Sequence, residues 1–185
     1  GIVLNVVAVH SGYLADLSRS GRLDVSILFS KTAASDLTVE PLLDEELYLV
    51  LPRESALVAL DQASVTLAQV AALPLIFPSP DYGLQRQIML EFARRNLPYE
   101  PLAEIDSLQL CLRYCARGAG ATIQPMCATT TLDLPERWRC VPISDVQLSR
   151  RNFLYSLPVQ KLSMAASLLH AELKDVVRRL VTSGS

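Results

Sequence analysis

The run Arg117-Gly118-Ala119-Gly120-Ala121-Thr122-Ile123-Gln124-Pro125 places a helix ending, a turn and a short apolar strand in one segment. Gly118 predicts the end of a helix, because glycine takes the left-handed conformation that closes helices without strain. Residues 121–123 follow as a strand, and Pro125 is typical of the turn after it. The run therefore predicts a helix that leads directly into a buried strand, as in an α/β fold.

The same alternation extends in both directions from this run. A helix before it carries an apolar face with Cys111, Leu112 and Cys115, and Asp106 or Ser107 can cap its start. Further helices are predicted over residues 13–20, 66–72, 84–96 and 163–181. Strands are predicted over residues 2–9, 23–29, 38–42, 46–51, 75–77, 103–105, 121–123, 140–143 and 152–157. Such alternation predicts parallel sheets with helices on both sides.

Two long strands, residues 46–51 and 152–157, flank a self-contained α/β block. We therefore expect two Rossmann-like lobes joined by two crossover strands. The first lobe should comprise residues 1–48 with 150–185, and the second residues 49–149.

Composition limits the classes of function. The chain has 185 residues, of which 50% are hydrophobic, enough for a sizeable core. Its formal charge is -2 and no block of Lys or Arg is present, so this stretch is not expected to bind DNA itself. The longest uncharged stretch, residues 62–79, is interrupted by Pro74 and Pro78, so no membrane span is expected. The first residues do not resemble a signal peptide, and a cytoplasmic setting is expected.

Cysteine spacing gives no sign of a metal site. The chain has four cysteines and two histidines: Cys111, Cys115, Cys127, Cys140, His10 and His170. No CxxC pair occurs, and the histidines lie far from the cysteines in sequence. We expect no metal and no cofactor, and we interpret the cysteines as small, buried apolar side chains.

An enzyme would need a nucleophile beside a base. His10 and Ser11 are the only close Ser–His pair, and adjacent residues of a strand point to opposite faces. No GxSxG motif or Gly-rich phosphate loop is present. The sequence therefore predicts a protein that is not an enzyme.

Several segments, in order, resemble the effector domain of LysR-type transcriptional regulators. They are Ser11-Gly12, Gly21-Arg22-Leu23-Asp24, Glu40-Pro41-Leu42-Leu43, Glu46-Leu47-Tyr48-Leu49-Val50, Leu73-Pro74-Leu75-Ile76, Glu104-Ile105-Asp106-Ser107 and the run 117–125. Each segment alone has an ordinary structural explanation, and their shared order carries the resemblance. Within the family, the run after Leu43 and the Pro78-Ser79 loop resemble nitrogen assimilation control regulators.

The resemblance implies a fold like that of type II periplasmic binding proteins, with an effector cleft between two lobes. It implies a small-molecule effector, a homodimer that forms a tetramer in the full-length protein, and DNA binding through an N-terminal winged helix-turn-helix outside this sequence. Two alternatives stay open: a constitutive oligomerisation module without an effector, and a solute-binding protein of the same fold.

The sequence departs from the family pattern in two places. The family domain normally begins with a strand and a helix ahead of the segment that matches residues 2–9, and neither is found in this sequence. Gln124 stands where an aliphatic residue usually precedes the proline. A polar amide at that position should face the cleft or have an internal partner.

Effectors of open α/β sheets bind beyond the carboxyl ends of strands, where helix N-termini offer unpaired N–H groups. The residues at such strand ends are Ser11, Ser79, Ser107 and Gln124. Each could instead be only a cap or turn residue. We expect them to line one cleft that binds a small polar or anionic molecule.

Charged residues near these strand ends have simpler explanations. Arg86 is expected to face solvent, and Asp106 to act as a helix cap. Arg150 and Arg151 are expected to pair with Asp or Glu across the lobes.

The resemblance also implies a twofold, antiparallel dimer in which residues 2–20 of one subunit face residues 84–96 of the other. Both helices carry more apolar surface than a helix covered on one side needs. The predicted interface residues are Tyr13, Leu17, Leu84, Ile88, Met89 and Phe92. The alternative is that these side chains pack inside their own lobe.

Overall fold

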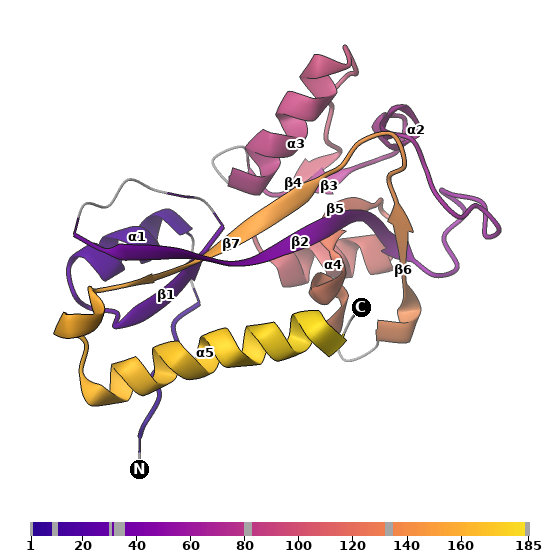
Figure 1. The fold of residues 1–185 in the computed structure, drawn as a ribbon. Coiled ribbons are helices and arrows are strands. Elements are labelled where there is room, and N and C mark those ends of the chain that lie inside the picture. Colours follow the sequence, from indigo (N-terminus) through magenta and orange to yellow (C-terminus); the bar gives the residue numbers. More distant parts are fainter. Residues whose placement is uncertain are drawn as a thin grey trace. The chain divides into compact units, whose positions relative to one another are not determined.

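A computed structural model describes residues 2–8, 11–29, 31, 36–79, 83–131 and 135–183. The chain divides into two compact units: unit 1 is residues 1–44 with 151–185, and unit 2 is residues 45–150. Two long strands, β2 (Thr38–Pro52) and β7 (Ser149–Ser156), run through both units, and both boundaries fall within them (Figure 1).

Unit 2 is built on a mixed sheet. β3 (Ile76–Phe77) and β4 (Ala103–Glu104) pair in parallel, and a parallel bridge from Leu75 to Ala121 joins this pair to β5 (Thr122–Pro125). The second half of β2 pairs antiparallel with β5 and with β6 (Trp138–Pro142). The predicted parallel pairing therefore holds for β3, β4 and the start of β5, but it is wrong for β2, which pairs antiparallel with both β5 and β6.

Alternation along β2 gives unit 2 two packed faces. Leu47, Leu49 and Leu51 point to one face, which α2 (Leu67–Ala71) and α3 (Gly83–Arg94) cover. Val50 points to the other face, where α4 (Leu108–Ala116) covers it. Helices therefore lie on both faces of this sheet, as predicted.

Local signals fix where the helices of unit 2 begin and end. Thr66 and Gln69 form a capping box at the start of α2. The Ser107 hydroxyl oxygen caps α4 by accepting from the Leu110 N–H. After α4, Gly118 takes a φ of 80° and turns the chain into β5, as its sequence predicts.

Gly120 allows a close backbone approach in unit 2. A Cβ built on Gly120 would lie 2.3 Å from the Pro74 carbonyl oxygen. The same carbonyl accepts a hydrogen bond from the Ala121 N–H, at 2.9 Å. The absence of a side chain at Gly120 thus lets β5 lie beside the segment that leads into β3.

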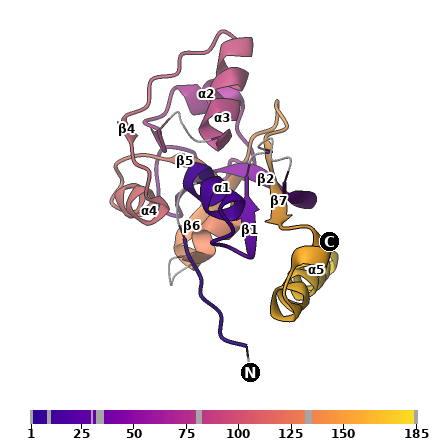
Figure 2. The same cartoon turned by 90° about the vertical axis from the view of Figure 1, so that its left-hand side faces the viewer.

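Unit 1 contains α1 (Ser11–Arg19), β1 (Val25–Leu28), the remaining parts of β2 and β7, and α5 (Met164–Ser183). β1 pairs antiparallel with β7, and α1 lies against β1 (Figure 2). Ala15, Leu28 and Tyr155 form the centre of a small core. A 2.7 Å hydrogen bond between the Ser18 and Ser26 hydroxyls adds a buried polar contact between α1 and β1.

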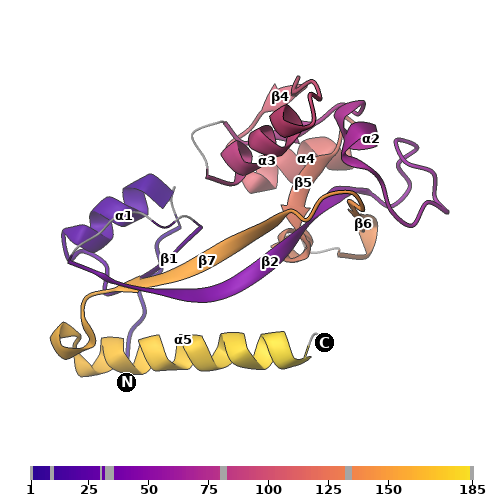
Figure 3. The ribbon, with the colours of Figure 1, turned by 45° about the horizontal axis from the view of Figure 1, so that its top comes forward.

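The C-terminal helix α5 is one continuous helix of 20 residues (Figure 3). The helix was predicted to begin at Ser163, and the Ser163 hydroxyl oxygen accepts from the Ala166 N–H at its start. Ala166 and His170 are buried, and Lys174 forms an ion pair with Glu40 of β2. These contacts attach the first half of α5 to unit 1. No described helix is both long and apolar enough to cross a membrane.

Several predicted elements differ from the structure. Residues 2–8 form no strand with any described residue, and Val9 lies outside the described residues, so the predicted strand over 2–9 is not observed. β1 is not buried on both faces, because Ile27 is exposed. The two predicted strands over 38–42 and 46–51 are one strand, β2. Short 3-10 helices over Met126–Thr131, Pro135–Arg137 and Val159–Lys161 were not predicted.

Candidate functional site

Three of the four predicted effector-site residues lie at the carboxyl ends of strands in unit 2. Ser79 follows β3, Ser107 follows β4, and Gln124 lies in β5. Because β3 runs parallel to β4 and is bridged in parallel to β5, these ends lie along one edge of the sheet. The topology therefore brings Ser79, Ser107 and Gln124 to a common edge.

A hydrogen bond ties the first two strand ends together. The Ser79 N–H donates to the Asp106 carboxylate over 2.8 Å, so the segment after β3 is held against the segment after β4. Asp106 was predicted to cap a helix, but its neighbour Ser107 takes that role. The carboxylate of Asp106 is thus engaged by backbone at this edge.

The Ser107 hydroxyl is exposed and close to helix N–H groups. Its oxygen accepts from Leu110 at 3.4 Å, which leaves the hydroxyl hydrogen able to donate. The first N–H groups of α4 lie in the same turn, and that turn contains no acidic residue. This end of α4 can therefore donate hydrogen bonds to an acceptor on a small molecule.

Gln124 is buried, with 6% of its surface exposed. It stands opposite Tyr48 of β2 in the sheet register, on the face that α4 covers. Its amide can donate and accept from within the sheet edge.

Ser11, the fourth predicted site residue, belongs to unit 1. It is the first residue of α1, and its side chain lies outside the described residues. Its part in an effector site stays a prediction.

The arginines near the predicted site pair locally. Arg150 donates to Glu45 at 2.7 Å, and both belong to unit 2. Arg151 donates to Asp44 at 2.6 Å, and both belong to unit 1. The predicted pairing across lobes is therefore wrong for these contacts, because the arginines of β7 find their acids on β2 within the same unit. Arg151 also holds the pKa of the Asp44 carboxyl below its usual value, chiefly through this hydrogen bond.

Two functional candidates were not found from the sequence. Gln85 of α3 is fully buried, and neither atom of its amide has a hydrogen-bond partner among the described residues. The signal that could have found it is its spacing, since residues 85, 88 and 92 form the buried face of α3. The second candidate is Cys127, which is exposed and donates its thiol to Glu45 over 2.9 Å.

The cysteine prediction holds only in part. Cys111 and Cys115 are buried on one face of α4, whereas Cys140 is half-buried and Cys127 is exposed. Among the described residues, no group of three or more potential ligands could hold a metal ion.

The predicted dimer residues have different environments. Ile88 and Phe92 pack in the core of unit 2 with almost no exposed surface, and Leu17 is buried in unit 1. These three side chains have little surface to offer a partner in this structure. Tyr13 is exposed, and Leu84 and Met89 are half-buried.

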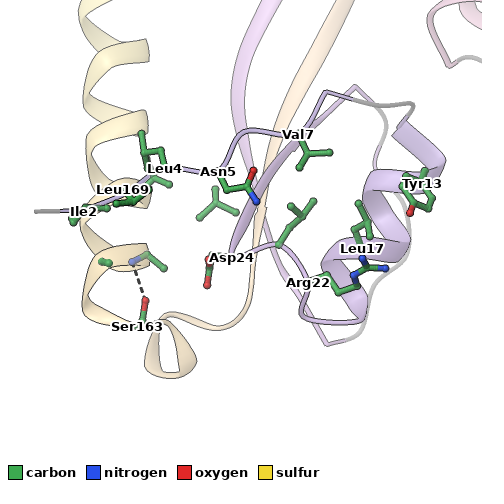
Figure 4. A pocket seen from close by; sticks show the side chains of 15 residues that line it. Ile2, Leu4, Asn5, Val7, Tyr13, Leu17, Arg22, Asp24, Ser163 and Leu169 are labelled. Carbon is green, nitrogen blue, oxygen red and sulfur yellow. Dashed lines mark hydrogen bonds between the residues drawn. The ribbon is translucent and has the colours of Figure 1, made fainter.

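Unit 1 contains a cavity of about 470 Å³ between residues 2–7, the start of β1 and the first turns of α5 (Figure 4). Asn5, Arg22 and Asp24 are among its polar lining residues, and Tyr13 and Leu17 also line it. Ser79, Ser107 and Gln124 are not among the described residues that line it.

Comparisons with known proteins agree with the resemblance seen in the sequence. The model of the LysR substrate binding domain matches residues 1–178. The nitrogen assimilation regulatory protein nac of Klebsiella aerogenes is 30% identical over 119 residues, 64% of this chain and 37% of that protein. The HTH-type transcriptional regulator BbuR of Bordetella bronchiseptica is 30% identical over 120 residues, 65% of this chain and 36% of that protein. The matched part is thus little more than a third of either regulator.

Solved structures support the fold. The CcmR regulatory domain of Synechocystis PCC6803, in complex with 2-PG, superimposes with a TM-score of 0.76 at 16% identity, covering 91% of this chain and 80% of that one. The BenM effector binding domain with benzoate gives a TM-score of 0.73 at 17% identity, covering 95% of this chain and 77% of that one. The predicted fold class, like that of type II periplasmic binding proteins, is confirmed. Its matched relatives are transcriptional regulators, and the chain belongs to the LysR substrate-binding domain family.

Proposed function

We propose that this domain binds a small polar or anionic effector at the strand-end edge of unit 2 and passes the signal to the DNA-binding domain of a longer regulator. The observation that carries the proposal is the convergence of Ser79, Ser107 and Gln124 at the carboxyl ends of neighbouring strands. Hydroxyl, amide and helix N–H groups there can donate to a ligand that carries acceptors, and the Asp106 carboxylate at the same edge is engaged by the Ser79 N–H.

Family membership supports the regulatory part of the proposal. The matched relatives are named as regulators, and solved domains of this fold hold 2-PG or benzoate. We propose that units 1 and 2 are the two lobes of such a domain. A ligand that favours one arrangement of the lobes shifts their equilibrium, and the full-length protein reads this shift as a change in DNA binding.

Assembly and setting complete the proposal. We infer a homodimer that forms a tetramer in the full-length protein, acting in the cytoplasm without enzymatic activity. The dimer supplies the twofold symmetry with which paired DNA-binding domains recognise two half-sites.

Calorimetry against a panel of organic acids, hydroxy acids and amides, including benzoate, shikimate and benzamide, tests the binding. Gln124→Leu should weaken binding of a panel member with little loss of stability, because the amide is at the site edge. Ser107→Asp keeps a helix-capping oxygen but adds a charge that repels an anion. Ser107→Asp should therefore weaken the binding of acids more than the binding of amides.

A reporter gene under the full-length regulator tests the output. The two variants should change the response to the bound panel member and leave expression of the protein unchanged. If no panel member binds and the variants regulate as the wild type does, the domain is a constitutive oligomerisation module.

A further inference from the structure

Gln85 is a buried amide in an apolar setting. It lies on the face of α3 that also carries Ile88 and Phe92, and it is fully buried. Neither its Nε2 nor its Oε1 has a hydrogen-bond partner among the described residues. Burial of an unpaired donor and acceptor is unfavourable, so an apolar side chain would make a more stable core at this position.

The place of Gln85 in the helix indicates what its amide could contact. Gln85 is in the first turn of α3, which begins at Gly83. Helical side chains lean toward the N-terminus of their helix, so we expect the Gln85 amide to lie toward the start of α3. α3 follows β3 and Ser79 in the chain, so its start is at the same end of β3 as the proposed effector site.

The surroundings of this helix start favour a ligand with acceptor groups. The first N–H groups of a helix have no partner within the helix, and the first turn of α3 contains no acidic residue. Arg86, in the same turn, is exposed. A ligand acceptor placed here meets donors from the backbone and from Gln85 Nε2, whereas Gln85 Oε1 still requires a donor.

We propose that Gln85 contacts the effector directly and selects for a small molecule that carries a hydrogen-bond donor beside an acceptor, such as a primary carboxamide or a hydroxy acid. This inference rests on the proposed effector site of unit 2. Such a ligand satisfies both atoms of the amide at once. A simple carboxylate offers acceptors only and leaves Gln85 Oε1 unpaired.

The test compares Gln85→Leu with Gln87→Leu, a matched control because Gln87 is exposed on the same helix. In the absence of ligand, Gln85→Leu should unfold at the same temperature as the wild type or higher, because it removes an unpaired buried amide and keeps the volume filled. A structural role for the amide predicts a lower unfolding temperature.

Calorimetry with benzamide, shikimate and benzoate then measures selection by the amide. For the wild type, benzamide or shikimate should bind more tightly than benzoate. Gln85→Leu should weaken binding of the preferred probe at least about tenfold, or about 1.4 kcal/mol in binding free energy. It should change benzoate binding less, and Gln87→Leu should change neither.

The outcomes separate this inference from the proposed function. Suppose that the wild type binds panel members and that Gln124→Leu weakens this binding whereas Gln85→Leu does not. The role of Gln85 is then overturned and the effector site stands. Preference for benzoate overturns the selection in the same way. If no panel member binds the wild type, the proposed function fails and the inference falls with it.

Discussion

Replacement of Gly120 by alanine, a change of one methyl group, should strongly reduce the stability of unit 2. Gly120→Ala places a Cβ 2.3 Å from the Pro74 carbonyl oxygen, and that oxygen is backbone, held by its hydrogen bond to Ala121. We expect a loss of about 3 kcal/mol or more in unfolding free energy, at the upper end of single-residue effects. Urea denaturation followed by circular dichroism measures it.

Gly21→Ala provides the matched control. Gly21 has a φ of 68° but no atom within 4 Å of a built Cβ, so only backbone strain opposes the substitution. We expect a cost of about 1–2 kcal/mol. Equal losses in the two variants would show that the chain moves away from Pro74 without difficulty.

Cys127 should react slowly although it is exposed. Burial of part of the side chain and the nearby Glu45 carboxylate raise the pKa of the Cys127 thiol to about 11. The thiolate is the reactive form, so at pH 8 its alkylation should be about a hundredfold slower than that of a cysteine with a pKa of 9.

Iodoacetamide labelling read by mass spectrometry measures that rate, with Cys127→Ser giving the background. Glu45→Gln should speed labelling, because it removes the charge that opposes ionisation while Arg150 remains nearby. A wild-type rate typical of free cysteine would contradict the role of Glu45.

Sequence could predict some residues of the site and not others. Ser107 was a candidate both as a cap and as a site residue, because serine before an apolar helix signals an N-terminus. Gln85 was missed because a polar residue in an amphipathic helix is normally assigned to the solvent face. Its burial depends on how α3 rotates against the sheet, which single-residue patterns do not determine.

At the scale of elements, the stability contributed by α3 should depend on pH through the Glu91 carboxyl. Hydrogen bonds from Arg95 and Arg94 lower the pKa of the Glu91 carboxyl. A carboxyl with a lowered pKa in the folded state contributes stability above its unfolded pKa, and this contribution is lost as pH falls through the folded pKa.

Glu91→Gln should therefore reduce the drop in stability between pH 6 and about pH 3. The expected difference is small, about 0.5 kcal/mol, because both arginines remain partly exposed. Thermal unfolding at both pH values measures it, with Glu100→Gln as a control on an exposed residue. Parallel pH profiles for wild type and Glu91→Gln would contradict this contribution.

Elements with their own local signals were predicted well, and those that depend on partners were not. Apolar spacing together with Thr66, Ser107 and Gly118 located α2 and α4, because caps and closing glycines act within a few residues. Residues 2–8 have the composition of a strand but no described strand beside them to complete their hydrogen bonds. The antiparallel pairing of β2 with β5 and β6 was also missed, because the alternation of residues along one strand does not determine the direction of its partner.

At the scale of the whole molecule, we expect the wild-type chain to form a homodimer in solution. Tyr13 and Met89 are the predicted interface residues to test, because both retain accessible surface, unlike Ile88 and Phe92. Tyr13→Glu or Met89→Glu should give a folded monomer, since a charge is costly in a desolvated interface. Light scattering with circular dichroism measures assembly and folding together.

Leu60→Glu is the control, because Leu60 is an exposed apolar residue outside the predicted interface. It should leave the dimer intact. A wild-type chain that is monomeric at high concentration, or variants that unfold, would contradict the predicted interface.

The two units are also unequal in the order of their synthesis. Unit 2 is one continuous stretch, residues 45–150, whereas unit 1 needs residues 151–185 to supply β7, the partner of β1. The ribosome therefore synthesises the strands β2, β3, β4, β5 and β6 before most of β7 and α5. Because units fold as their chains emerge, unit 2 can fold before β7 and α5 are made, and unit 1 completes its sheet only after β7 has been made.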